Sequence, residues 1–235
     1  FNVHHLTQRH GEVWRPGQLQ VVHCGVDRRR LPDPSLAPPR EEGLIVCVGR
    51  LDPIKGFDVL LHALARLQAS AVDYHCVIVG EGPLRQRLER LRERLRLLEQ
   101  VEMPGAMPQE QVQALMARAC VFAMPSVVTR EGNRDGIPVA LMEAMAGAGA
   151  VVSTRVSGIP ELVAHERTGL LVDPGDADGL ALVLHRLLVD PGLRERLGAA
   201  ARAHVLESFE AGSQTERLLS HFSRALMHRT PQHVG

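Results

Sequence analysis

The sequence predicts an α/β domain built around a parallel β-sheet, and two observations carry this prediction. Short runs rich in β-branched residues alternate with longer amphipathic runs from about residue 19 onward, a pattern typical of βαβ units. In addition, 45% of the 235 residues are hydrophobic, which is ample for the core of one large α/β domain or two small ones. We therefore expect strands and helices to alternate along most of the chain.

The expected strands are short and apolar. They lie near residues 19–24, 43–49, 74–79, 120–124, 150–153 and 169–172, with a weaker candidate at 100–103. Parallel neighbours in a sheet need a crossover connection, which is usually helical. Helices are therefore expected between these strands.

Apolar residues at helical spacing indicate where two of these helices lie. In GFDVLLHALARLQ they fall at positions 57, 60, 61, 64 and 67, and in GPLRQRLERLRERLRLL leucines stand at 84, 88, 91, 95 and 98. The arginines of the second helix fit a solvated surface with glutamate partners better than a binding patch. Beyond the last strand, further helices are expected over 176–189, 192–208 and roughly 212–227.

The charges of the chain balance, with 27 Lys and Arg against 27 Asp and Glu. The overall electrostatic field therefore gives no reason to expect nucleic acid or an acidic membrane surface as a partner. Any anion must be bound by a local group of cations.

The cysteines and histidines do not have the spacing of metal ligands. Cys24, Cys47, Cys76 and Cys120 lie far apart within apolar, strand-like stretches. We expect buried, reduced thiols in a cytoplasmic protein. The 12 histidines are scattered, and no metal site is predicted.

A first candidate site lies in VCVGRLDPIKGFDVLL, where a strand ends at Gly49, Arg50 follows, and Lys55 precedes a helix. Ligands of open parallel sheets bind beyond the carboxyl ends of strands. A cation at a helix N-terminus is unfavourable because that end carries partial positive charge, and an anion beside Arg50 and Lys55 would remove the penalty. A diphosphate fits two such cations; the alternative is two exposed cations on a loop.

A second strand-to-helix turn, VIVGEGPLRQRL, carries Gly80 and Gly82. It resembles the start of a dinucleotide-binding motif, but Arg85 stands where the third glycine belongs. The turn could bring the backbone close to a nucleotide, and plain turn geometry is the alternative.

The third candidate is RDGIPVALMEAMAGAG, which holds two carboxylates, Asp135 and Glu143. Asp135 is suited to cap the following helix, with Pro138 in the first turn, and a cap alone is one interpretation. Glu143 is the only charged residue from Ile137 to Gly149. A buried carboxylate is costly unless it gains hydrogen bonds, and the hydroxyl pair of a sugar would supply them; a solvent-facing glutamate is the alternative.

Three separated motifs agree in their order along the chain. They are VGRLDPIKG, VGEGP, and DGIPVALMEAMA followed by TRVSGIPELV and TGLLVDPGD. Together they resemble the C-terminal, donor-binding domain of retaining glycosyltransferases of the GT-B fold, in the large bacterial group-one family. VVHCGVD and GIPVALMEAMA are similar to transferases that build exopolysaccharide and colanic-acid-type repeat units. The resemblance implies a Rossmann-like parallel sheet with helices on both faces, one half of a two-domain GT-B enzyme.

The resemblance also implies roles for the site residues. The family carries two glutamates separated by seven residues, and here Glu143 is the second while Asp135 stands at the first. Glu143 would hold the ribose hydroxyls, and the catalytic residues would be Asp135 near the reacting carbon with Arg50 and Lys55 on the diphosphate. The turn of Gly136, Ile137 and Pro138 would present backbone amides to phosphate or sugar. Aspartate is shorter than glutamate by one methylene, which leaves the identity of the donor sugar open.

The resemblance further implies the domain organisation. We expect residues 1–18 to be a linker or the tail of an N-terminal domain, and 19–210 to form the nucleotide-sugar-binding domain. Residues 211–235 would be a C-terminal helix that packs back towards the N-terminal domain, with a tail. The acceptor, a glycan or lipid-linked molecule, would bind through that other domain, so this fragment alone should transfer nothing.

The predicted function is the donor-binding half of a retaining hexosyltransferase in exopolysaccharide or cell-surface glycan synthesis. Its donor would be a UDP- or GDP-sugar, with no cofactor and no metal, because the two cations would replace the divalent ion that other transferases use. Localisation would be cytoplasmic, with peripheral association of the whole enzyme at the inner face of the plasma membrane as an option. The alternative function is a regulatory or degenerate nucleotide-binding domain without transfer activity.

Overall fold

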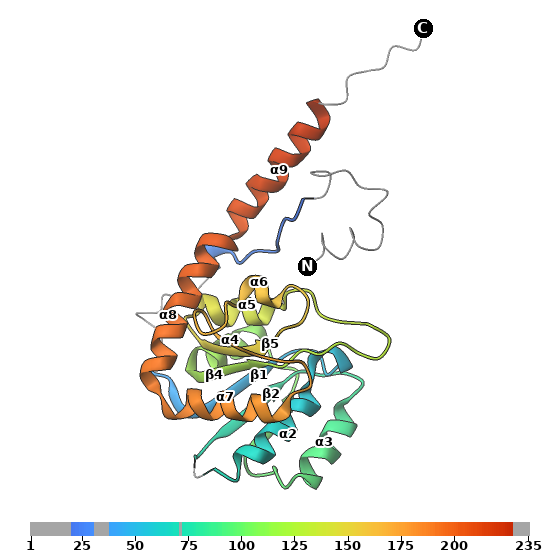
Figure 1. The fold of residues 1–235 in the computed structure, drawn as a ribbon, viewed down its shortest axis with the longest axis vertical. Coiled ribbons are helices and arrows are strands. Elements are labelled where there is room, and N and C mark those ends of the chain that lie inside the picture. Colours follow the sequence, from blue (N-terminus) through green and yellow to red (C-terminus); the bar gives the residue numbers. More distant parts are fainter. Residues whose placement is uncertain (1–19, 31–37, 71, 228–235) are drawn as a thin grey trace.

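The computed structural model describes residues 20–30, 38–70 and 72–227. Within them the chain forms a six-stranded parallel sheet of order β3-β2-β1-β4-β5-β6 (Figure 1). The strands are β1 (Glu41–Val48), β2 (His75–Val79), β3 (Val101–Gly105), β4 (Ala119–Met124), β5 (Ala150–Thr154) and β6 (Leu170–Val172). The chain adds β2 and β3 on one side of β1 and then returns to place β4 on the other side. The predicted Rossmann-like α/β fold is thereby confirmed.

Helices connect and cover the strands. They are the short 3₁₀ turns η1 (Arg28–Arg30) and η3 (Pro53–Lys55) and the α-helices α2 (Phe57–Leu67), α3 (Arg85–Arg94), α4 (Gln109–Arg118), α5 (Val139–Ala146), α6 (Ile159–Leu162), α7 (Ala177–Val189), α8 (Pro191–Ser208) and α9 (Ala211–Met227). A proline stands in the first turn of α6 and of α8, where the fixed φ of proline matches the helical conformation. The side chains of Asp176 and Asp190 cap α7 and α8 by accepting from backbone amides.

Two hydrophobic clusters hold the helices on opposite faces of the sheet (Figure 1). Leucines of α2, α3 and α7 pack with alternate strand residues such as Ile45 and Ile78 on one face. Residues of α4, α5 and α6 pack with the other set, including Val46 and Phe122, on the second face. Alternate strand residues point to opposite faces, so a sheet covered on both sides needs near-continuous apolar strands, as in LIVCV of β1.

Two predicted elements need correction, one strand and the end of one helix. The strand predicted at 19–24 is wrong: its described residues, 20–24, form no strand, and the nearby Val26 makes an isolated bridge to Glu210. The helix predicted through Leu98 ends at Arg94, because Arg96 takes a left-handed backbone conformation with φ 58°. Leu98, which the helical spacing placed on the apolar face, is exposed, and Leu97 is buried.

The cysteines also differ from the expectation at one position. All four are free thiols, but Cys24 is exposed while Cys47, Cys76 and Cys120 are buried. Burial raises the pKa of each of the three buried thiols, so they stay protonated at neutral pH. Cys24 is exposed because its segment lies outside the sheet.

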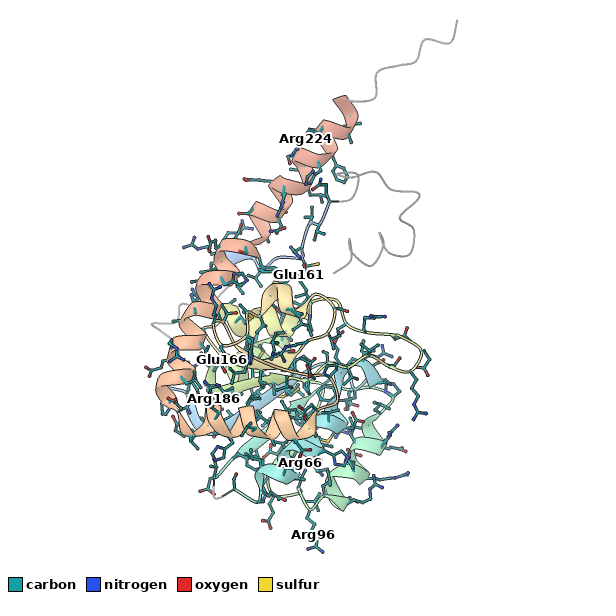
Figure 2. All side chains as sticks on the ribbon, viewed as in Figure 1. Arg66, Arg96, Glu161, Glu166, Arg186 and Arg224 are labelled. Carbon is teal, nitrogen blue, oxygen red and sulfur yellow. The ribbon has the colours of Figure 1, made fainter. Side chains whose placement is uncertain are left out.

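The segments that enter and leave the domain lie side by side. The amide of Val26 donates to the carbonyl of Phe209 at 2.9 Å, and the amide of Ala211 donates to the carbonyl of Val26 at 3.0 Å. From this point α9 extends away from the sheet (Figure 1), and Figure 2 shows Arg224 on its distant part. The helix predicted over 212–227 is therefore present, as α9.

In the described ranges no helix combines the length and the apolar character needed to span a bilayer. The nearly uncharged run from Gly136 to Thr154 forms the short helix α5 and the strand β5.

Candidate functional site

The candidate site lies where the loops after β1 and β4 meet. These strands are neighbours in the sheet, yet the chain reaches β2 and β3 before it returns to β4. Their crossovers lie on opposite faces, because α2 and α5 belong to different hydrophobic clusters. Open α/β sheets bind ligands outside the carboxyl ends of the strands at such a reversal.

The loop after β1 carries both predicted cations. Arg50 extends into solvent with 73% of its side chain exposed, and its Nε lies 4.0 Å from an oxygen of Asp52. Asp52 caps η3, whose last residue is Lys55. Lys55 runs back over the end of β1, since a Cβ on Gly49 would lie 3.6 Å from its Cε.

A close backbone approach joins this loop to the loop after β4. Gly56 has a φ of +65°, and a Cβ there would lie 2.0 Å from the carbonyl oxygen of Pro125. Only glycine suits both the conformation and the space. The amide of Val127 donates to the carbonyl of Ile54 at 2.9 Å, so the two loops are held together just before α2.

This junction brings Lys55 and Asp135 into direct contact. The Lys55 Nζ donates to Asp135 Oδ1 at 2.9 Å, and only 16% and 11% of the two side chains are exposed. The hydroxyl of Ser126 donates to the other carboxylate oxygen at 2.8 Å. An ion pair so shielded from water is little screened by salt.

The interpretation of Asp135 as a helix cap is wrong. The N-cap of α5 is Pro138, which has no side chain able to cap, and α5 begins at Val139. Asp135 instead lies before the turn of Gly136 and Ile137 and points at Lys55 and Ser126. The structure thus removes the helix-cap alternative for Asp135; its contact with a sugar stays a prediction.

Glycine is required at positions 80 and 82 because the loop after β2 packs closely against the loop after β1. A Cβ on Gly80 would lie 1.9 Å from the carbonyl oxygen of Gly49, and one on Gly82 would lie 2.6 Å from that of Leu51. The amide of Leu51 donates to the carbonyl of Glu81 at 2.9 Å. These glycines therefore let the β2 loop support the loop of Arg50; their contact with a nucleotide stays a prediction.

The Gly136, Ile137 and Pro138 turn is open on one side and packed on the other. Apart from its chain neighbours, no described residue has a heavy atom within 4 Å of a Cβ built on Gly136. Ile137 packs on the loop after β5, since a Cβ on Gly158 would lie 2.8 Å from its Cγ1. Pro138 is buried. The packing of Ile137 and Pro138 thus holds the turn in place, and Gly136 stays exposed.

Glu143 lies on α5 with its side chain half-buried. Among the described residues its carboxylate has no hydrogen-bond or ion-pair partner, and desolvation raises its pKa. Such a carboxylate can accept hydrogen bonds from a ligand or from solvent, so the solvent-facing alternative stays open. No hydrogen bond or ion pair joins Glu143 to Lys55 or Asp135, whose partners are each other and Ser126.

The sequence interpretation missed the hydroxyl groups beneath the site. Ser126 and Thr154 are buried at the ends of neighbouring strands β4 and β5, and the hydroxyl of Thr154 donates to the carbonyl of Ser126. Polar residues directly after apolar strands were the available signal. Their pairing depends on which strands are neighbours, which the sequence did not give.

Across the ranges that the structure describes, no group of three or more His, Cys, Asp or Glu side chains is arranged to hold a metal ion. What the site offers is the Arg50 guanidinium, the remaining protons of Lys55, free carboxylate lone pairs and exposed backbone at Gly136. Such groups bind anions and hydroxyl groups.

The family model described as glycosyl transferases group 1 matches residues 29–204. The chain is also 38% identical over 206 residues to WcaL of Salmonella typhimurium, named as a colanic acid biosynthesis glycosyltransferase, covering 87% of this chain and 51% of that protein. It is 35% identical over 209 residues to a GDP-mannose-dependent α-(1-6)-phosphatidylinositol monomannoside mannosyltransferase of Mycolicibacterium smegmatis, covering 85% and 55%. The chain thus spans about half the length of these curated relatives.

Solved structures share the fold. A sucrose-phosphate synthase from Thermosynechococcus elongatus aligns with a TM-score of 0.79 and 27% identity, covering 97% of this chain and 57% of that one. Anabaena HepE in complex with UDP and glucose aligns with a TM-score of 0.76 and 22% identity, covering 91% and 59%.

Proposed function

The chain belongs to the group 1 glycosyl transferases, and we propose from this premise that it is the donor-binding domain of a retaining hexosyltransferase. The donor would be a nucleotide diphosphate sugar, and the acceptor a glycan or lipid-linked molecule in exopolysaccharide or cell-surface glycan synthesis. The observation that carries the proposal is the junction of the β1 and β4 loops. It places Lys55 against Asp135 at the point where an open α/β sheet binds its ligand.

The names of the relatives support the donor class. One relative is named for GDP-mannose, HepE was solved with UDP and glucose, and WcaL is named for colanic acid biosynthesis. A nucleoside diphosphate is the part that these donors share. The base and the sugar are left to experiment.

Arg50 and Lys55 are assigned to the diphosphate. Arg50 is solvated and can turn towards a ligand. Lys55 is held by its hydrogen bond to Asp135, and the other N–H groups of its ammonium can donate to a ligand. Negative charge grows on the diphosphate as the glycosidic bond breaks. Prepositioned cations stabilise that charge more than the ground state, which lowers the barrier.

Glu143 is assigned to the ribose hydroxyls and Asp135 to the sugar. Neither oxygen of the Glu143 carboxylate has a partner within the part of the chain that the structure describes, and burial raises its pKa; both oxygens can therefore accept from a pair of neighbouring hydroxyl groups. A carboxylate has about four lone-pair positions, so Asp135 can accept from a sugar hydroxyl while it keeps Lys55 and Ser126. The turn at Gly136 would face phosphate or sugar with its backbone, and Gly80 and Gly82 would lie near the nucleotide.

The remaining part of the proposal concerns the whole enzyme. A second domain would carry the acceptor, α9 would pack against it, and transfer would take place in the cleft between the two. The complete enzyme would work in the cytoplasm, at the inner face of the plasma membrane.

Calorimetric titration with UDP and GDP tests the donor site in both this chain and the intact enzyme. We expect binding of at least one nucleotide, weakened about ten-fold or more by Lys55→Ala or Glu143→Ala, because each removes charge-assisted hydrogen bonds. Gly136→Ala is a steric probe, since its methyl group enters open space in the free protein. It should weaken binding of a nucleotide sugar without lowering the unfolding temperature.

Two results would contradict the proposal. One is the absence of binding at millimolar nucleotide, and the other is binding unchanged in both Lys55→Ala and Glu143→Ala. Nucleotide binding in an intact protein that neither hydrolyses nor transfers any nucleotide sugar would instead favour a regulatory domain.

A further inference from the structure

Ser126 is a fully buried polar residue directly beneath the proposed site. It follows β4 after Pro125, with none of its surface exposed to solvent. Its hydroxyl donates to Asp135 Oδ2 at 2.8 Å, and its amide donates to the carbonyl of Met124 at 3.0 Å. Burying a hydroxyl group is unfavourable unless it is hydrogen-bonded, and here its hydrogen bond ends on a site carboxylate.

The backbone of Ser126 is fixed from the neighbouring strand. The hydroxyl of Thr154, at the end of β5, donates to the carbonyl of Ser126. The hydroxyl of Ser153, one residue before Thr154, donates instead to the carbonyl of Met124 at 2.6 Å, so its hydrogen bond ends on β4 and not on Ser126. The position of the Ser126 hydroxyl is therefore set by two strands of the sheet and not by the long loop that carries Asp135.

Asp135 needs such an anchor because its own segment is long. The turn before α5 joins it to that helix, and Lys55 Nζ and Ser126 Oγ hold its two oxygens at 2.9 Å and 2.8 Å. A carboxylate held at both oxygens cannot rotate freely. It then holds the Lys55 ammonium in one place as well.

We propose that Ser126 is a positioning residue for transfer, acting through Asp135 to fix the Lys55 ammonium against the leaving diphosphate. This inference rests on the proposed function, because it needs Lys55 at the diphosphate. Loss of the Ser126 hydroxyl leaves both charges present but lets the carboxylate turn. The diphosphate still binds, while stabilisation of the charge that develops as the bond breaks is reduced.

The test compares Ser126→Ala with Ser153→Ala in the intact enzyme. Both serines are fully buried at adjacent strand ends, and each side chain donates one hydrogen bond. Similar losses of unfolding temperature are expected. Only Ser126→Ala should lower kcat, by about ten-fold, with nucleotide affinity changed less than about two-fold, since an oriented hydrogen bond to a charged group is lost.

A double-mutant cycle with Asp135→Asn tests whether Ser126 acts on kcat through Asp135. If Ser126 acts through Asp135, Ser126→Ala should have almost no further effect on kcat in Asp135→Asn. The inference would be overturned if the two substitutions lowered kcat independently, so that the double variant showed the product of the two separate losses. Equal kcat in Ser126→Ala and Ser153→Ala would also overturn it, and either result would leave the proposed function intact. No turnover of any nucleotide sugar by the unaltered enzyme would overturn both.

Discussion

At the residue scale, Glu143 and Asp135 show how surroundings separate two carboxylates of one segment. Asp135 has a cation and a hydroxyl group as partners. Glu143 is half-buried without a partner among the described residues, and desolvation raises its pKa. A carboxylate in that state reduces the stability of the free protein and is compensated when a ligand supplies hydrogen bonds.

Glu143→Gln should therefore stabilise the ligand-free protein and weaken nucleotide binding. The folded-state pKa of Glu143 is raised, so its contribution to stability is present below the ordinary glutamate pKa and is lost as pH rises through the folded value. The gain from Glu143→Gln, less than about 1 kcal/mol because the group is half-solvated, should appear at neutral pH and vanish near pH 4. Thermal unfolding across pH measures it.

The control for this prediction is Glu93→Gln, at an exposed position of α3. It should change neither the stability of the ligand-free protein nor its nucleotide binding. Nucleotide affinity of the unaltered protein should also fall in mild acid, beginning above the pH at which an ordinary glutamate titrates. A stability gain that stayed constant from pH 4 to pH 7 would argue against desolvation of Glu143 as its cause.

At the scale of elements, Arg194 joins α7, α8 and β1 at the end of the sheet opposite the site. Only 6% of its side chain is exposed, and Nη1 donates to the carbonyls of Leu187 and Leu188 at 2.8 and 2.9 Å. Nη2 donates to both oxygens of Glu42. The last carbonyls of a helix have no partner within the helix, and Arg194 supplies one for α7.

Arg194→Met should lower the free energy of unfolding by about 2–3 kcal/mol, because two carbonyls lose their donor in a buried place. Glu42→Gln is the matched variant: it keeps an acceptor at a side chain that is 70% exposed, and it should cost about 1 kcal/mol or less. Urea unfolding gives both values. Equal losses would mean that the ion pair, and not the end of α7, determines the effect.

At the scale of the whole molecule, α9 is an amphipathic helix that leaves the domain (Figure 1). Leu219 and Phe222 are 58% and 57% exposed, and Leu226 is exposed as well. Such a surface is covered in most stable proteins. We proposed above that the second domain of the enzyme covers it.

The double variant Leu219→Ser, Phe222→Ser should leave the unfolding temperature of this 235-residue chain within about 1 °C, because exposed side chains contribute little. In the intact enzyme it should lower both the unfolding temperature and transfer. Leu197→Ala, at a buried position of α8, should destabilise both proteins by about 2–5 kcal/mol. An intact enzyme indifferent to the double variant would contradict the packing of α9.

The sequence by itself determined the elements and the loops of the site. Strands β1 to β6 and helices such as α2 follow from periodicity and apolar runs, which act between residues close in the chain. The same local signals indicated Arg50, Lys55, Asp135 and Glu143 as candidates. They failed for the strand predicted at 19–24, whose described residues form no strand because the segment lies beside α9 and outside the sheet.

Only the tertiary structure decided how these loops meet. Lys55 and Asp135 are 80 residues apart, and their contact requires β4 to lie beside β1. That strand order also puts Ser126 under Asp135 and Thr154 beside Ser126. Local propensity cannot distinguish a helix cap from an ion pair at Asp135, because the partner's position depends on the packing of the whole sheet.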